Sequence, residues 1–117
     1  MKRKISFYIR DILQNIEIAE DFIHGMSREE FENDRKTLYA VLRAIEVIGE
    51  ATKHVPAEIR DRHLEIPWKE MAGMRDKVIH DYIDVDVESV WLVVKDRIVG
   101  IKPLIQKVLR ELEKQEN

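Results

Sequence analysis

The chain has 117 residues, of which 44% are hydrophobic and 37% are charged, and its formal net charge is −3. That length fits one domain, which we place over residues 1–117, and the composition is that of a folded protein. The absence of cysteine excludes disulfides and thiolate metal sites. The net charge argues against a broad basic surface for nucleic acid, and no segment approaches the roughly 20 apolar residues of a membrane span, so we expect a cytoplasmic protein without a membrane partner.

The first region with a clear period runs from residue 5 to residue 23. Apolar side chains recur there every three or four positions, which is the spacing of one face of an α-helix. Gly25 follows this stripe, where a left-handed cap is common. Ser27, with Glu30 three residues later, has the form of a capping box. We therefore expect one helix over residues 5–23 and a second helical region that begins after Ser27.

Two helical regions are predicted in the middle of the chain. An apolar stripe from residue 31 to residue 52 is closed by Pro56, because the residue before a proline disfavours the helical conformation. Gly49 costs this helix about 1 kcal/mol relative to alanine, and we interpret it as a point where another helix comes close, within the fold or across a dimer. Pro67 suits the first turn of the next helix, which is predicted to continue through Val78.

The last third of the chain predicts one more helix. Periodicity is lost between residues 81 and 86, and Asp86 suits the N-cap of a stripe that begins at residue 87. Gly100 and Pro103 are expected to kink or split this helix before the stripe resumes. No strand-like alternation persists along the chain. The expected fold class is therefore all-α, an antiparallel bundle of four or five helices.

The candidate chemistry lies in residues 73–82. This segment holds a permanent cation, Arg75, a group that titrates near neutral pH, His80, and a phenol, Tyr82. Cleavage of RNA without a metal needs proton transfer at the 2′-hydroxyl or the leaving 5′-oxygen, which suits a histidine. It also needs a group that stabilises charge on the phosphate, which suits an arginine. Since the usual phosphate-loop and zinc-helix motifs are absent, we expect no metal and no cofactor.

The spacing of these residues constrains how they can meet. Arg75 and His80 are five positions apart, so an unbroken helix would turn them about 140° away from each other. Asp76 and His80 have the i, i+4 spacing at which a carboxylate can orient an imidazole. Arg75 and His80 would therefore flank a groove, and a two-fold dimer would bring two arginines and two histidines into one cleft.

Other polar and aromatic residues are interpreted as structural. Glu46 is expected in a buried salt bridge, and Trp68 and Trp91 in the core or an interface, because each tryptophan falls on the apolar stripe of its helix. The remaining histidines are expected at the surface: His24, His54 and His63.

The motif Arg75-x4-His80-Asp81-Tyr82 resembles the Arg-x4-His-x-Tyr signature of HepT-like proteins in the HEPN superfamily. Asp76 fits the polar position that follows the arginine in that superfamily. The resemblance covers nearly the whole chain, and three flanking blocks look like the same family: residues 34–36, 43–51 and 67–75.

The resemblance implies a HEPN-like helical dimer with a metal-independent endoribonuclease site lined by both protomers. It implies that Arg75 stabilises the scissile phosphate, that His80 is the general acid or base, and that Asp76 orients His80 or Arg75. HepT-like members are toxins paired with a minimal nucleotidyltransferase antitoxin, which can attach AMP to the motif tyrosine, here Tyr82, and so block the cleft with bulk and negative charge.

Two other interpretations remain open from the sequence. The chain could be a HEPN protein without nuclease activity that serves as the partner or substrate-binding subunit of a minimal nucleotidyltransferase. It could also be a structural helical dimer in which the motif is fortuitous.

Overall fold

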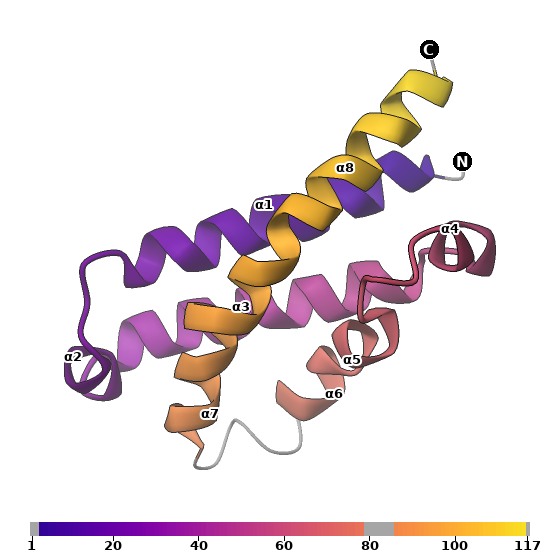
Figure 1. Cartoon of the computed structure of the whole chain (residues 1–117). Coiled ribbons are helices and arrows are strands. Elements are labelled where there is room, and N and C mark those ends of the chain that lie inside the picture. Colours follow the sequence, from indigo (N-terminus) through magenta and orange to yellow (C-terminus); the bar gives the residue numbers. More distant parts are fainter. Residues whose placement is uncertain (1–2, 79–85, 117) are drawn as a thin grey trace.

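The computed structural model describes residues 3–78 and 86–116 of the chain. Three long helical elements form its frame: α1 (Ile5–Ile23), α3 (Arg35–Lys53) and α8 (Ile98–Glu116). Figure 1 shows α1 and α3 side by side, with α8 crossing α1. The ends of α1 and α8 are joined by side-chain contacts from Ser6 to Glu116 and from Glu20 to Lys102, so these two helices run antiparallel.

The core lies between the apolar faces of these helices, as their periodicity predicts. Most of the predicted stripe of α1 is buried, and so is most of the stripe predicted over residues 31–52. Branched aliphatic side chains dominate this core. Because protein interiors are closely packed, changes in the volume of these side chains are expected to be destabilising. Its fully buried members include Ile9, Ile12, Ile16, Phe31, Val41, Ile45, Ile48, Val94, Ile98, Ile105 and Val108.

The region between α1 and α3 contains one helix break more than the sequence pattern predicts. The capping box of Ser27 and Glu30 is confirmed and starts α2 (Arg28–Glu32), and Gly25 is confirmed in the left-handed region with φ of 77°. The second helical region then breaks before Asp34, whose carboxylate accepts a hydrogen bond from the Thr37 backbone N–H at 3.0 Å. This N-cap satisfies a free donor at the first turn of α3, so the chain can turn there.

The third predicted helix is also shorter than expected. After α4 (Ala57–Arg62), which the sequence analysis did not predict, Pro67 precedes α5 (Trp68–Ala72), and a turn at Gly73 separates α5 from α6 (Met74–Lys77). The prediction of one helix through Val78 is therefore wrong. Glycine is among the weakest helix formers, so a break is easily accommodated at Gly73, although α3 and α8 continue through Gly49 and Gly100.

The last helical segment runs from α7 (Val87–Leu92) through a π-helical turn, η2 (Val93–Arg97), into α8. Asp86 caps α7 as predicted, because its side chain accepts from the Ser89 backbone N–H at 3.1 Å. The predicted split at Gly100 and Pro103 is wrong, since α8 passes through both, and a kink at these residues stays a prediction. Pro103 has no backbone N–H, so the carbonyl of Val99 lacks its helical partner. Both residues are exposed, so water can hydrate this carbonyl and the helix need not end.

The all-α fold class is confirmed, because helices and no strands occur within residues 3–78 and 86–116. Trp68 and Trp91 are confirmed as core residues, at 5% and 8% exposure. None of the described helices is both long and apolar enough to span a membrane. The two-fold dimer stays a prediction.

Candidate functional site

Arg75 lies on the short helix α6, where it packs directly against α3. The contact point on α3 is Gly49, which is buried. A Cβ atom added to Gly49 would lie 2.5 Å from the backbone nitrogen of Arg75, closer than any real Cβ contact. The interpretation of Gly49 as a site of close helix approach is therefore confirmed, and the approach is within the fold.

The guanidinium of Arg75 is held by the next residue of α3, Glu50. Glu50 Oε2 lies 3.3 Å from Arg75 Nε, and the Arg75 side chain remains 41% exposed. A pairing through Nε leaves the two terminal nitrogens of the guanidinium available as a fork for a phosphate. Glu50 was not predicted from the sequence, because nothing in the helical pattern separates it from the other exposed glutamates.

Arg75 lies at one side of a cleft of about 390 Å³ between α1, α3 and α6. Three arginines line this cleft, and each has a carboxylate partner that also lines it. The pairs are Arg3 with Asp11 at 2.9 Å, Arg43 with Glu46 at 2.6 Å, and Arg75 with Glu50. The cleft therefore offers cations that are already oriented, although its formal charge is nearly balanced.

Glu46 differs from its expected place. It does form the expected ion pair, but Arg43 in that pair is 71% exposed and Glu46 is 30% exposed, so the prediction of a buried salt bridge is wrong. The reason is the register of α3, which buries the neighbouring Ile45 and turns residue 46 toward the cleft.

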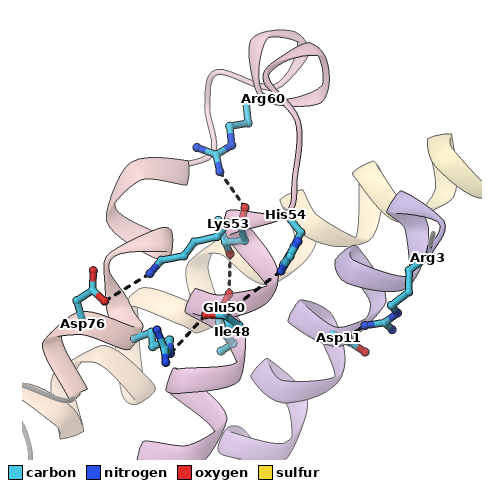
Figure 2. Close-up of polar contacts among 10 residues, drawn as sticks. Arg3, Asp11, Ile48, Glu50, Lys53, His54, Arg60 and Asp76 are labelled. Atoms are coloured by element: carbon cyan, nitrogen blue, oxygen red, sulfur yellow. Dashed lines mark hydrogen bonds and ion pairs between the residues drawn. The ribbon is translucent and has the colours of Figure 1, made fainter. Parts of the chain in front are cut away.

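Asp76 lies beside Arg75 but contacts a lysine. Its Oδ1 is 3.4 Å from Nζ of Lys53, and its side chain is 59% exposed; Figure 2 shows this pair next to Glu50. The contact joins α6 to the last turn of α3, so it adds a second, weaker link between these helices. The expected contact between Asp76 and His80 lies outside the described residues.

His80 and Tyr82 also lie outside the described residues. The predicted groove between Arg75 and His80 therefore stays a prediction, as does the place of the Tyr82 phenol. Within the part of the chain that the structure describes, no cluster of three or more histidine, aspartate or glutamate side chains is arranged to hold a metal ion.

The other histidines divide into two kinds. His24 and His54 are exposed, as expected. His63 is buried, so its assignment to the surface is wrong. It follows the last turn of α4, its Nε2 lies 2.9 Å from Oε2 of Glu111 on α8, and its carbonyl accepts a hydrogen bond from the indole of Trp68 at 3.0 Å. These polar contacts allow the His63 ring to be buried. The apolar periodicity of the sequence does not reveal them, so the burial was not predicted.

Comparisons with known proteins agree on one family. The pattern of the family described as Ribonuclease HepT-like matches residues 12–108. A protein of Thermococcus cleftensis named as probable ribonuclease HepT is 46% identical over 108 residues, which cover 92% of this chain and 98% of that protein. A Methanocaldococcus jannaschii protein named as a candidate RNase is 44% identical over 117 residues, 99% of this chain and 97% of its own. No solved structure matches the chain.

Proposed function

The chain belongs to the HepT-like ribonuclease family, and on that premise we propose that it is a metal-independent endoribonuclease and the toxin of a HEPN/MNT toxin–antitoxin pair. The observation that carries the proposal is Arg75, half-exposed beside a cleft and held in place by Glu50. The ion pair favours one orientation of the guanidinium, which reduces the side-chain entropy lost when it binds a phosphate.

In the proposed reaction the 2′-hydroxyl of the RNA attacks the adjacent phosphorus, and the bond to the 5′-oxygen breaks. The products are a 2′,3′-cyclic phosphate and a 5′-hydroxyl end. Arg75 stabilises the negative charge that grows on the phosphate oxygens. His80 takes the proton from the 2′-hydroxyl or gives one to the leaving 5′-oxygen. In a two-fold dimer with a shared cleft, the two His80 side chains could divide these two tasks.

Tyr82 is the proposed control point. A minimal nucleotidyltransferase antitoxin would transfer AMP from ATP to the phenol oxygen, with release of pyrophosphate. The added nucleotide would bring bulk and negative charge to the segment that carries His80, and would oppose the binding of an RNA phosphate. Mass spectrometry of the protein after co-expression with such an enzyme should find one AMP on Tyr82 and none on a Tyr82→Phe variant.

Cleavage of RNA by the purified protein in excess EDTA tests the proposed activity. The parent should cleave and leave 2′,3′-cyclic phosphate ends, whereas Arg75→Ala and His80→Ala should each lose about 10²- to 10⁴-fold in rate. Arg62→Ala, which removes an exposed arginine of α4, is the matched control and should cleave like the parent. No cleavage by the parent, with Tyr82 shown to be unmodified, would favour a catalytically inactive partner of the nucleotidyltransferase instead.

A further inference from the structure

Two rings from different helices are stacked on the wall of the Arg75 cleft. Tyr8 of α1 and His54, which caps the end of α3, have ring centroids 4.6 Å apart and planes inclined by 10°. Both line the same cleft as Arg75. The His54 side chain is 50% exposed, so about half of its surface remains open to a ligand in the cleft.

The stack lies at the edge of the apolar core, against which Tyr8 packs, and is supported from the side of α1. The core face of α1 consists of Ile9, Ile12 and Ile16, whereas Tyr8 is only partly buried. The guanidinium of Arg3 lies over the Tyr8 ring, 4.7 Å from its centroid, and is fixed in turn by Asp11. The rings are therefore held at a defined place without belonging to the core, and their orientation is set before any ligand binds.

One carboxylate connects the stack to Arg75. Glu50 places Oε2 3.3 Å from Arg75 Nε and Oε1 3.9 Å from His54 Nε2; Figure 2 shows Glu50 beside His54, with Arg3 and Asp11 on the neighbouring helix. Because a single carboxylate contacts both side chains, the guanidinium and the imidazole lie within the span of one nucleotide. A phosphate bound by Arg75 can therefore direct its adjoining base toward His54.

We propose that His54, backed by Tyr8, is a nucleobase subsite, where the base next to the phosphate held by Arg75 stacks on the exposed face of the imidazole. The subsite rests on the proposed function, which supplies RNA as the ligand. A base can stack on a protein ring only when it is not stacked within an RNA helix. The subsite therefore selects single-stranded or looped RNA. Every base has a π-face, so the preference between bases is weak.

Binding of RNA that cannot be cleaved distinguishes the contribution of the base to affinity from that of the phosphate. We would measure, by fluorescence anisotropy, the affinity for two 2′-O-methyl hexanucleotides, one with adenine at every position and one with no bases. Stacking of one base predicts that the parent binds the adenine oligonucleotide about tenfold more tightly. His54→Ala should lose most of this preference and leave the affinity for the abasic oligonucleotide unchanged. His54→Phe, which restores a ring, should recover the preference.

Two more variants keep the result interpretable. Tyr8→Leu keeps apolar bulk but removes the supporting ring, and should also reduce the preference for bases. His24→Ala removes an exposed histidine at the other end of α1, about 24 Å from Tyr8 along the helix, and should bind both oligonucleotides like the parent. Circular dichroism confirms that each variant is folded.

The outcomes for this subsite and for the proposed function differ. If His54→Ala and Tyr8→Leu keep the full preference for bases while Arg75→Ala weakens binding of both oligonucleotides, the subsite is overturned and the nuclease proposal stands. If the parent binds neither oligonucleotide and does not cleave RNA, both proposals fail. A preference for bases that is lost in His54→Ala and regained in His54→Phe supports the subsite.

Discussion

The three-helix frame and the α5–α6 region hold their positions by different means. In α1, α3 and α8, each helix has 19 residues and a continuous apolar face. In α5 and α6, the helices have five and four residues and are separated at Gly73. Helices that short are unstable by themselves, so α6 depends on its contacts with α3.

The difference shows how the candidate site is built. Arg75 is placed on a weak element, but that element is held against a strong one by backbone contact at Gly49 and by the Glu50 and Lys53 side chains. Three neighbouring positions of one long helix therefore hold the element that carries the candidate arginine. A site of this kind should be sensitive to small changes on α3 and insensitive to similar changes elsewhere in the frame.

Among the variants that leave the motif residues in place, Gly49→Ala should produce the largest effect. The new Cβ would lie 2.5 Å from the Arg75 backbone nitrogen, so α6 must move away and carry Arg75 with it. We expect a loss of about 1–3 kcal/mol in the free energy of unfolding and about a hundredfold loss in the rate of RNA cleavage. Thermal unfolding and the EDTA cleavage assay measure the two effects.

Gly100→Ala is the matched control for this change. An added Cβ at Gly100 meets nothing within 4 Å, and alanine favours a helix interior by up to about 1 kcal/mol. The variant should be slightly more stable and cleave like the parent. Equal cleavage by Gly49→Ala and Gly100→Ala would contradict the role of close packing at Gly49.

His63→Ala should weaken the frame without changing the site. The substitution removes a buried ring and its contact with Glu111 at 2.9 Å, and should reduce the free energy of unfolding by about 2 kcal/mol. The folded protein should retain the parent cleavage rate, since the ring lies between α4 and α8 rather than at the cleft. A normal unfolding midpoint would show that this contact does not hold α4 to α8.

Glu50→Ala should lower the rate of cleavage with little effect on stability. It frees the Arg75 guanidinium and should lower cleavage by about tenfold, whereas loss of an exposed ion pair changes stability by less than about 1 kcal/mol. Glu50→Gln keeps an oxygen that can accept from Arg75 and should retain more of the activity. Glu58→Ala, at an exposed position of α4, is the control. Parent-like cleavage by Glu50→Ala would remove Glu50 from the positioning of Arg75.

Asp34→Ala should have the smallest effect, and that effect should depend on pH. Hydrogen bonds from the backbone and side chain of Thr37 hold the pKa of Asp34 below its usual value. The stabilisation is therefore complete above the usual carboxyl range near pH 4 and is lost as the pH falls through the lower pKa of the folded protein. Unfolding midpoints of parent and variant should differ at neutral pH and converge in acid. Asp61→Ala, which removes an exposed aspartate of α4, is the matched control and should unfold like the parent at neutral pH.

Long helices were predicted more accurately than short ones. The stripe of α1 and the caps at Ser27 and Asp86 could be predicted because they depend on residues within one or two turns. The break at Gly73 and the uninterrupted α8 through Pro103 could not. Whether a glycine or proline ends a helix depends on whether the neighbouring backbone groups find other hydrogen-bond partners, including water. The spacing of apolar residues carries no information about those partners.

The sequence by itself determined the all-α class, the core faces of the long helices, the family and the candidate Arg75, because periodicity and a short motif are local properties. Only the tertiary structure decided that Gly49 lies against the Arg75 backbone, that Glu50 holds its guanidinium, and that His63 is buried. It also decided that Tyr8 and His54, 46 positions apart in the chain, form one stack. Each of these contacts joins separate helices, and their packing depends on how the whole core closes.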